Sequence, residues 1–61
     1  MDDQPSWERT ARVSQAAGMV SVQAGCSPDH ALSLMADRAV IEHISLLALA
    51  LAVIEHTIRF N

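Results

Sequence analysis

The stretch ISLLALALAVIEH, residues 44–56, is almost entirely apolar in a chain of 61 residues with a formal net charge of −3. A helix needs about 20 consecutive apolar residues to cross a membrane. The run reaches Glu55 after about half that length, so it is too short for a membrane span. It therefore predicts a helix that is buried in the protein or that binds another chain.

A chain of this length forms one small domain, and such a domain buries only about 60% of the surface that its unfolded chain exposes. Disulfides, a metal ion or a partner chain usually supply the missing stability. Cys26 is the only cysteine, so an internal disulfide is excluded, and we expect it to be a small buried apolar residue. A partner chain is therefore the expected source of further stability.

Charge and motif content limit the possible functions. The four basic residues are all arginine, against seven acidic residues, and they form no basic stripe typical of a strong nucleic-acid binder. The chain has no glycine-rich phosphate loop, nucleophile elbow or paired cysteine motif. We expect a binding or assembly protein and not an enzyme, with no cofactor, metal ion or small-molecule substrate.

The N-terminal sequence MDDQPSWERT has no basic region followed by an apolar one, as a secretion signal would. We therefore expect a cytoplasmic protein. Residues 1–5 are expected to form a tail, and residues 6–61 a single helical domain.

The first helix is predicted over residues 6–24, with Ser6 as its N-cap. Its apolar residues recur at steps of three or four, as on a buried helix face; they are Val13, Ala16, Ala17, Val20 and Ala24. Gly18 costs about 1 kcal/mol relative to alanine in a helix interior, which predicts that another helix approaches it closely. Gly25 is expected to end the helix in the left-handed conformation.

A second helix is predicted over residues 28–43, because Ser27 is a good N-cap and Pro28 suits the first helical position. Its inward residues are expected to be Leu32, Met35, Ala36 and Ala39. Ser45 can cap a further helix, so a short break is expected at residues 43–45. The alternative is one continuous helix of about 50 Å, which is too long for a compact monomer of this size.

The third helix is predicted over residues 46–60, and on it the apolar run divides into two stripes. The first comprises Leu46, Leu49, Ala50, Val53, Thr57 and Phe60. The second, rotated by about 100°, comprises Leu47, Leu51, Ile54 and Ile58. One small core needs only one apolar stripe, so we expect the second to bind another subunit, with Trp7 as a further interface candidate. Glu55 and Arg59 are spaced for an ion pair.

The pentapeptide AVIEH occurs twice, at residues 39–43 and 52–56. Neither copy has the H-x-x-x-H or E-x-x-H spacing of a metal site on a helix. The repeat is therefore best explained by chance or by solvated polar positions.

Residues along most of the chain resemble a known family. They are QAAGMVSVQ at 15–23, Gly25, Ser27, Ala31, Leu32, Ala39, Leu46, Leu49, Ala50, Arg59 and Phe60. Their spacing, without gaps from about Val13 to Phe60, resembles the ANTAR domain of transcription antitermination regulators. The GMVSVQ sequence and the RF ending look particularly like actinobacterial members.

The resemblance implies an all-α, three-helix RNA-binding domain that forms a homodimer, or a larger assembly, through a helical extension. Family members bind paired stem-loops in nascent transcripts and so prevent terminator formation. No sensor module fits in 61 residues, so we expect either a stand-alone member or an excised piece, and the initial Met favours the former.

The charged positions depart from the family's pattern. Ala36 stands where Arg is common, and Ile44 and Ser45 stand where a basic residue, often followed by Pro, is common. His56 and Thr57 stand where actinobacterial relatives are often basic. The fold expectation is unaffected by these departures, whereas the support for RNA binding is reduced.

RNA recognition uses arginine and aromatic side chains on unstacked bases. The candidate RNA-binding residues are Arg9, Arg12, Gln15, Arg38 and Arg59. Each arginine also has a structural alternative, such as pairing of Arg38 with Glu42. The alternative function is a helical oligomerisation or protein-interaction module that has lost RNA binding. A continuous arginine-rich groove would favour the first function, and ion-paired arginines the second.

Overall fold

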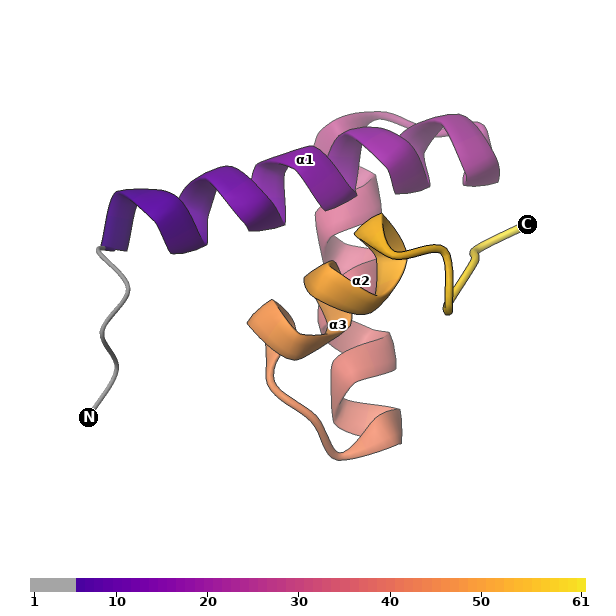
Figure 1. Cartoon of the computed structure of the whole chain (residues 1–61). Helices are drawn as coiled ribbons and strands as arrows, with labels where there is room; N and C mark the ends of the chain where they lie inside the picture. The colour runs from indigo at the N-terminus through magenta and orange to yellow at the C-terminus, as the bar shows by residue number, and fades with distance from the viewer. Residues whose placement is uncertain (1–5) are drawn as a thin grey trace.

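The computed structural model describes residues 6–61, which form an all-α bundle of three helices (Figure 1). α1 spans Ser6–Ala24, α2 spans Pro28–Glu42 and α3 spans Leu46–Ile54. The predicted fold class, the first two helices and the break between the second and third are confirmed. The predicted tail, residues 1–5, lies outside the described residues. No helix in the described part is both long and apolar enough to cross a membrane.

The core lies where the three helices meet, and each helix contributes three buried side chains to it. They are Ala16, Ala17, Val20, Ala31, Met35, Ala39, Leu49, Ala50 and Val53. Every pair of helices is in contact, and α1 and α3 share the most extensive contact. Because more than half of these side chains are alanine, the helix backbones can approach one another closely.

The N-terminal half of α1 projects beyond the other two helices (Figure 1). None of residues 6–15 is buried, and Trp7 is 70% exposed. This half of the helix therefore gains little from packing within its own chain.

Gly18 is not at a close helix contact, so that prediction was wrong. A Cβ atom added to Gly18 would meet nothing within 4 Å. Gly18 is two residues from both Ala16 and Val20, which places it about 160° round the helix from each of these buried residues. It therefore lies on the outer face of α1.

The start of α2 follows its sequence signals. Gly25 has a φ of 67°, and the Cys26 N–H donates to the Ser21 carbonyl at 3.0 Å, as expected at a left-handed helix end. Ser27 Oγ accepts a hydrogen bond from the His30 N–H at 3.1 Å. Both predicted caps are therefore confirmed.

The inward face of α2 differs from the predicted one. Leu32 is 39% exposed and Ala36 is also exposed, whereas Ala31 and Met35 are fully buried. Each wrongly predicted residue directly follows a buried one, so it lies about 100° further round the helix. The two neighbouring helices cover only the narrower face of α2 that carries Ala31, Met35 and Ala39.

The pentapeptide AVIEH ends a helix in both of its copies, residues 39–43 and 52–56. The final residues, His43 and His56, have φ values of 58° and 64°. This left-handed conformation is the one that Gly25 adopts at the end of α1. Histidine is among the few non-glycine residues enriched there. Both copies thus end a helix, and their Glu and His residues are exposed, as the explanation by solvated polar positions predicts.

The same hydrogen bond closes both copies. The Ile44 N–H donates to the Ala39 carbonyl at 3.1 Å, and the Thr57 N–H donates to the Ala52 carbonyl at 2.9 Å. Each bond joins the carbonyl of the first residue of the pentapeptide to the N–H of the residue directly after the pentapeptide, as in a Schellman motif. The two helix ends are thus alike in sequence, conformation and hydrogen bonding.

α3 ends at Ile54, so the predicted helix over residues 46–60 was too long. Thr57 Oγ1 also donates to the Ala52 carbonyl, at 2.9 Å. The Ala52 carbonyl therefore accepts hydrogen bonds from the N–H and the Oγ1 hydroxyl of Thr57, instead of the i,i+4 helical bond from the His56 N–H. A threonine side chain that competes for backbone acceptors in this way favours a helix end.

The early end of α3 changes what the last residues do. Thr57 is exposed, although it was placed on the core stripe. No ion pair joins Glu55 to Arg59 among those found in residues 6–61. Ile58 and Phe60 still pack against the core, but they reach it from an irregular segment.

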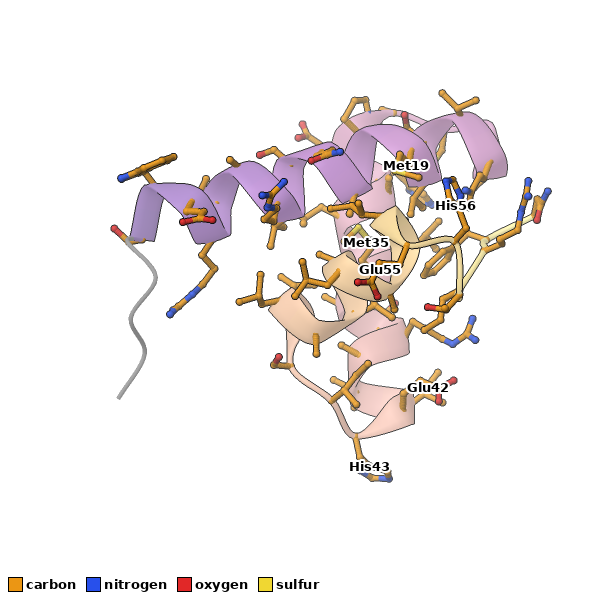
Figure 2. The ribbon with its side chains drawn as sticks, viewed as in Figure 1. Met19, Met35, Glu42, His43, Glu55 and His56 are labelled. Atoms are coloured by element: carbon orange, nitrogen blue, oxygen red, sulfur yellow. The ribbon has the colours of Figure 1, made fainter. Side chains whose placement is uncertain are left out.

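Replacing His43 by glycine is expected to raise the free energy of unfolding by about 0.5–1 kcal/mol. A left-handed conformation costs a non-glycine residue roughly 1–2 kcal/mol, partly offset by the greater entropy that glycine loses on folding. Figure 2 shows the His43 side chain pointing away from the bundle, so little packing is lost. Urea unfolding measures the change.

The matched control is His30→Gly, in the first turn of α2. Glycine is destabilising at an ordinary helical position, by up to about 1 kcal/mol. Equal losses of stability in both variants would show that His43 is not left-handed.

Candidate functional site

The predicted RNA-binding residues lie in two separate places. Arg9, Arg12 and Gln15 are on the projecting half of α1, whereas Arg38 is on α2 and Arg59 follows α3. The second place adjoins the C-terminal end of α1, through contacts described below. Along α1, Arg12 lies eleven residues before Gln23, a separation of about 16 Å at the usual rise per residue. The arginines therefore do not form the continuous groove that would favour RNA binding most directly.

On α1, the arginines are exposed. Arg12 Nη2 lies 4.0 Å from Glu8 Oε1, and an exposed pair at this separation contributes little to stability. Trp7 lies about 140° round the helix from Arg12, so the two side chains do not share one surface. Trp7 and Arg12 therefore offer no shared surface on which an RNA base could stack.

The second place is a cluster of four residues that we call the Arg38–Phe60 corner: Gln23, Arg38, Glu42 and Phe60. Gln23 Oε1 accepts a hydrogen bond from the Phe60 N–H at 3.0 Å. Arg38 lies over the Phe60 ring, with its guanidinium carbon 5.7 Å from the ring centroid, within the range of a cation–π interaction. The corner thus joins α1, α2 and the C-terminal segment.

An ion pair completes the corner. Arg38 Nε donates to Glu42 Oε2 at 2.8 Å, as the i,i+4 spacing predicted. The Arg38 side chain is 36% exposed, so the guanidinium is held in place without being removed from solvent. The sequence indicated the Arg38–Glu42 pair but gave no signal for the contacts of Gln23 and Phe60.

The predicted oligomer interface is divided between buried and exposed positions. Ile54 and Ile58 pack against the core of their own chain, and Leu47 is half-buried. Trp7 and Leu51 are exposed. The interface remains a prediction, with less free apolar surface on α3 than two full stripes would give.

Other large apolar side chains are exposed at places that the stripes did not indicate. The most exposed are Val22 on α1 and Val40 and Ile41 on α2. Single exposed apolar residues are common on protein surfaces. Their number in so short a chain nevertheless leaves apolar area available to a partner.

No group of three potential metal ligands and no pocket is found within residues 6–61. The two Glu–His pairs of the AVIEH copies lie at different ends of the bundle in Figure 2. They therefore do not combine into one site.

Comparison of the chain with protein-family models, curated proteins and solved structures finds no match. The functional argument therefore depends on the residues and on the geometry described above.

Proposed function

We propose that the chain is an RNA-binding transcription antitermination regulator of the ANTAR type, which binds paired stem-loops as a homodimer. The resemblance is supported by where its residues lie in the bundle. Ala31, Leu49 and Ala50 are buried, Gly25 takes the left-handed conformation, and Ser27 caps α2. These matched positions hold the helices together, whereas others, such as Gly18, Val22 and Leu32, are exposed.

The Arg38–Phe60 corner is the observation that carries the RNA-binding proposal. Proteins recognise unpaired RNA bases with aromatic and arginine side chains. The corner combines both types in contact, and Arg59 precedes Phe60 in the chain. The corner is open to solvent at Arg38, whose side chain is 36% exposed, so an RNA loop can reach it.

A homodimer would double the number of basic residues that one RNA can contact. Each chain has four arginines and an excess of acidic residues, which gives a weak electrostatic attraction for a single chain. Two chains would present two corners and two sets of α1 arginines. Paired stem-loops offer two matching RNA loops, one for each corner.

The test is a fluorescence titration of the protein with an RNA that carries two short hairpins, repeated at several salt concentrations. We expect hairpin-dependent binding whose log affinity falls with log salt by about 0.7–0.9 per phosphate contacted. A single-stranded RNA of the same composition is the control and should bind more weakly. Absence of binding at low salt, from protein shown to be folded by circular dichroism, would refute the proposal.

A second candidate function is a helical oligomerisation module without RNA binding. It is favoured by the exposed apolar residues Trp7, Val22 and Val40 and by the ion pairs that occupy Arg12 and Arg38. Both functions predict an oligomer, so the RNA titration separates them, and light scattering on the same protein shows whether an oligomer forms. A stable oligomer that binds neither RNA would support the module.

A further inference from the structure

We infer that the Arg38–Phe60 corner is a stacking platform for one unpaired nucleobase. This inference rests on the proposed RNA binding and goes beyond it, because it names the group that the corner would receive. The contacts of the corner, the exposure of Arg38 and the nearby charge of Glu42 carry it.

The first step concerns the order of the Arg38 side chain. Glu42 Oε2 holds its Nε at 2.8 Å, and the Phe60 ring lies against the guanidinium. The side chain is thereby constrained before any ligand arrives, although 36% of it is exposed. A ligand that stacks on a pre-ordered side chain avoids much of the entropy cost of ordering it.

The second step concerns the support beneath the guanidinium. Phe60 packs against the core, and its N–H is fixed by Gln23 Oε1 at 3.0 Å. The ring therefore covers one side of the Arg38 guanidinium and cannot swing freely. Of the Arg38 side chain, 36% stays exposed, and we place the flat group on this exposed part.

The third step concerns the kind of group that would bind. Arg38 Nε already donates to the carboxylate of Glu42, whose side chain is 43% exposed. This negative charge disfavours a phosphate at the same place. A nucleobase is uncharged, and its face stacks on a guanidinium plane. Within residues 6–61, Nε is the only Arg38 nitrogen that donates a hydrogen bond, so the Nη groups can donate, in the guanidinium plane, to RNA groups beside the stacked base.

Arg12 provides an internal comparison. Its guanidinium lies 4.0 Å from Glu8, and the ring contact found in the described residues belongs to Arg38. Arg12 is thus a charged side chain without a platform, and it serves as a matched control.

The experiment uses the two-hairpin RNA with 2-aminopurine placed at one loop position at a time. With the wild-type protein, we expect the fluorescence of one loop position to fall on binding, because a stacked 2-aminopurine is quenched. Arg38→Lys keeps the charge but removes the planar group, and Phe60→Leu keeps the apolar packing but removes the ring. Each variant should lose the position-specific fluorescence change. Each should also bind roughly 5- to 150-fold more weakly, as for the loss of one stacked base.

The comparison variant Arg12→Lys makes the same change at a second candidate RNA-binding arginine and should keep the fluorescence change, because the ring contact belongs to Arg38. The Arg38 side chain is partly exposed, so the Arg38→Lys variant should fold normally. The test therefore holds even if Phe60→Leu is unstable. If Arg38→Lys keeps wild-type affinity and quenching, the platform is refuted while the proposed function stands. A reduced salt slope in Arg38→Gln, with quenching kept in Arg38→Lys, would place a phosphate at Arg38 and also overturn the inference. Failure of the wild type to bind the RNA would overturn both.

Discussion

Replacing Leu49 by alanine is expected to lower the free energy of unfolding by about 2–5 kcal/mol. Leu49 is fully buried on α3, the helix with the most extensive contact to α1. A domain of this length has a total stability of roughly 3–9 kcal/mol, so the variant should be largely unfolded at room temperature or melt far below the wild type. Thermal unfolding followed by circular dichroism measures the effect.

Leu51→Ala is the matched control, because it is the same substitution two residues further along α3. Leu51 is 36% exposed, so the change should cost only about 1–2 kcal/mol in a monomer. Equal losses in the two variants would contradict the burial pattern of α3. A loss at Leu51 that depends on protein concentration would instead indicate that Leu51 lies in an oligomer interface.

Gly25→Ala is expected to lower the free energy of unfolding by about 1–2 kcal/mol. Gly25 has a φ of 67°, and a Cβ in this conformation crowds the following carbonyl oxygen even though nothing else lies within 4 Å. The cost comes from the backbone and not from packing. Urea unfolding of the wild type and the variant measures it.

The same substitution at Gly18 should have the opposite sign. Gly18 lies inside α1 with open space around it, so alanine should raise the free energy of unfolding by about 0.5–1 kcal/mol. The pair of variants compares one chemical change at a left-handed and at a helical position. Destabilisation by Gly18→Ala would show that another chain or segment packs closely on that face.

The sequence predicted those parts of the fold that local residue types determine. Gly25, Ser27 and Pro28 each have a strong positional preference, and they place the end of α1 and the start of α2 correctly. The ends of α2 and α3 depend on His43 and His56. Histidine is acceptable inside a helix as well as at its left-handed end, so its presence alone does not mark a boundary.

The wrong predictions of which helix face is buried have their cause in the arrangement of the three helices. An apolar residue beside a buried one differs from it only by about 100° round the helix. Whether Ala31 or Leu32 is buried depends on where α1 and α3 lie, and periodicity cannot supply that direction. Gly18 illustrates the same limit, because the helix that was expected near it packs on the opposite face of α1.

The candidate site was predictable only in its local part. The Arg38–Glu42 pair follows from spacing within one helix. The contacts of Phe60 with Gln23 and Arg38 join segments far apart in the chain. They form because α3 ends early and directs the last residues back toward α1 and α2. That path could not be seen from a pattern that continued the helix to residue 60.

The alanine-rich core has a consequence for how this sequence can vary. Five of the nine buried side chains in residues 6–61 are alanine, and each marks a place where larger residues would force neighbouring helices apart, typically at about 1–3 kcal/mol. Core residues should therefore tolerate neither larger nor smaller replacements, since smaller residues in place of the few larger side chains would leave cavities. Tolerated variation, natural or engineered, should concentrate on exposed helix faces such as the outer face of α1.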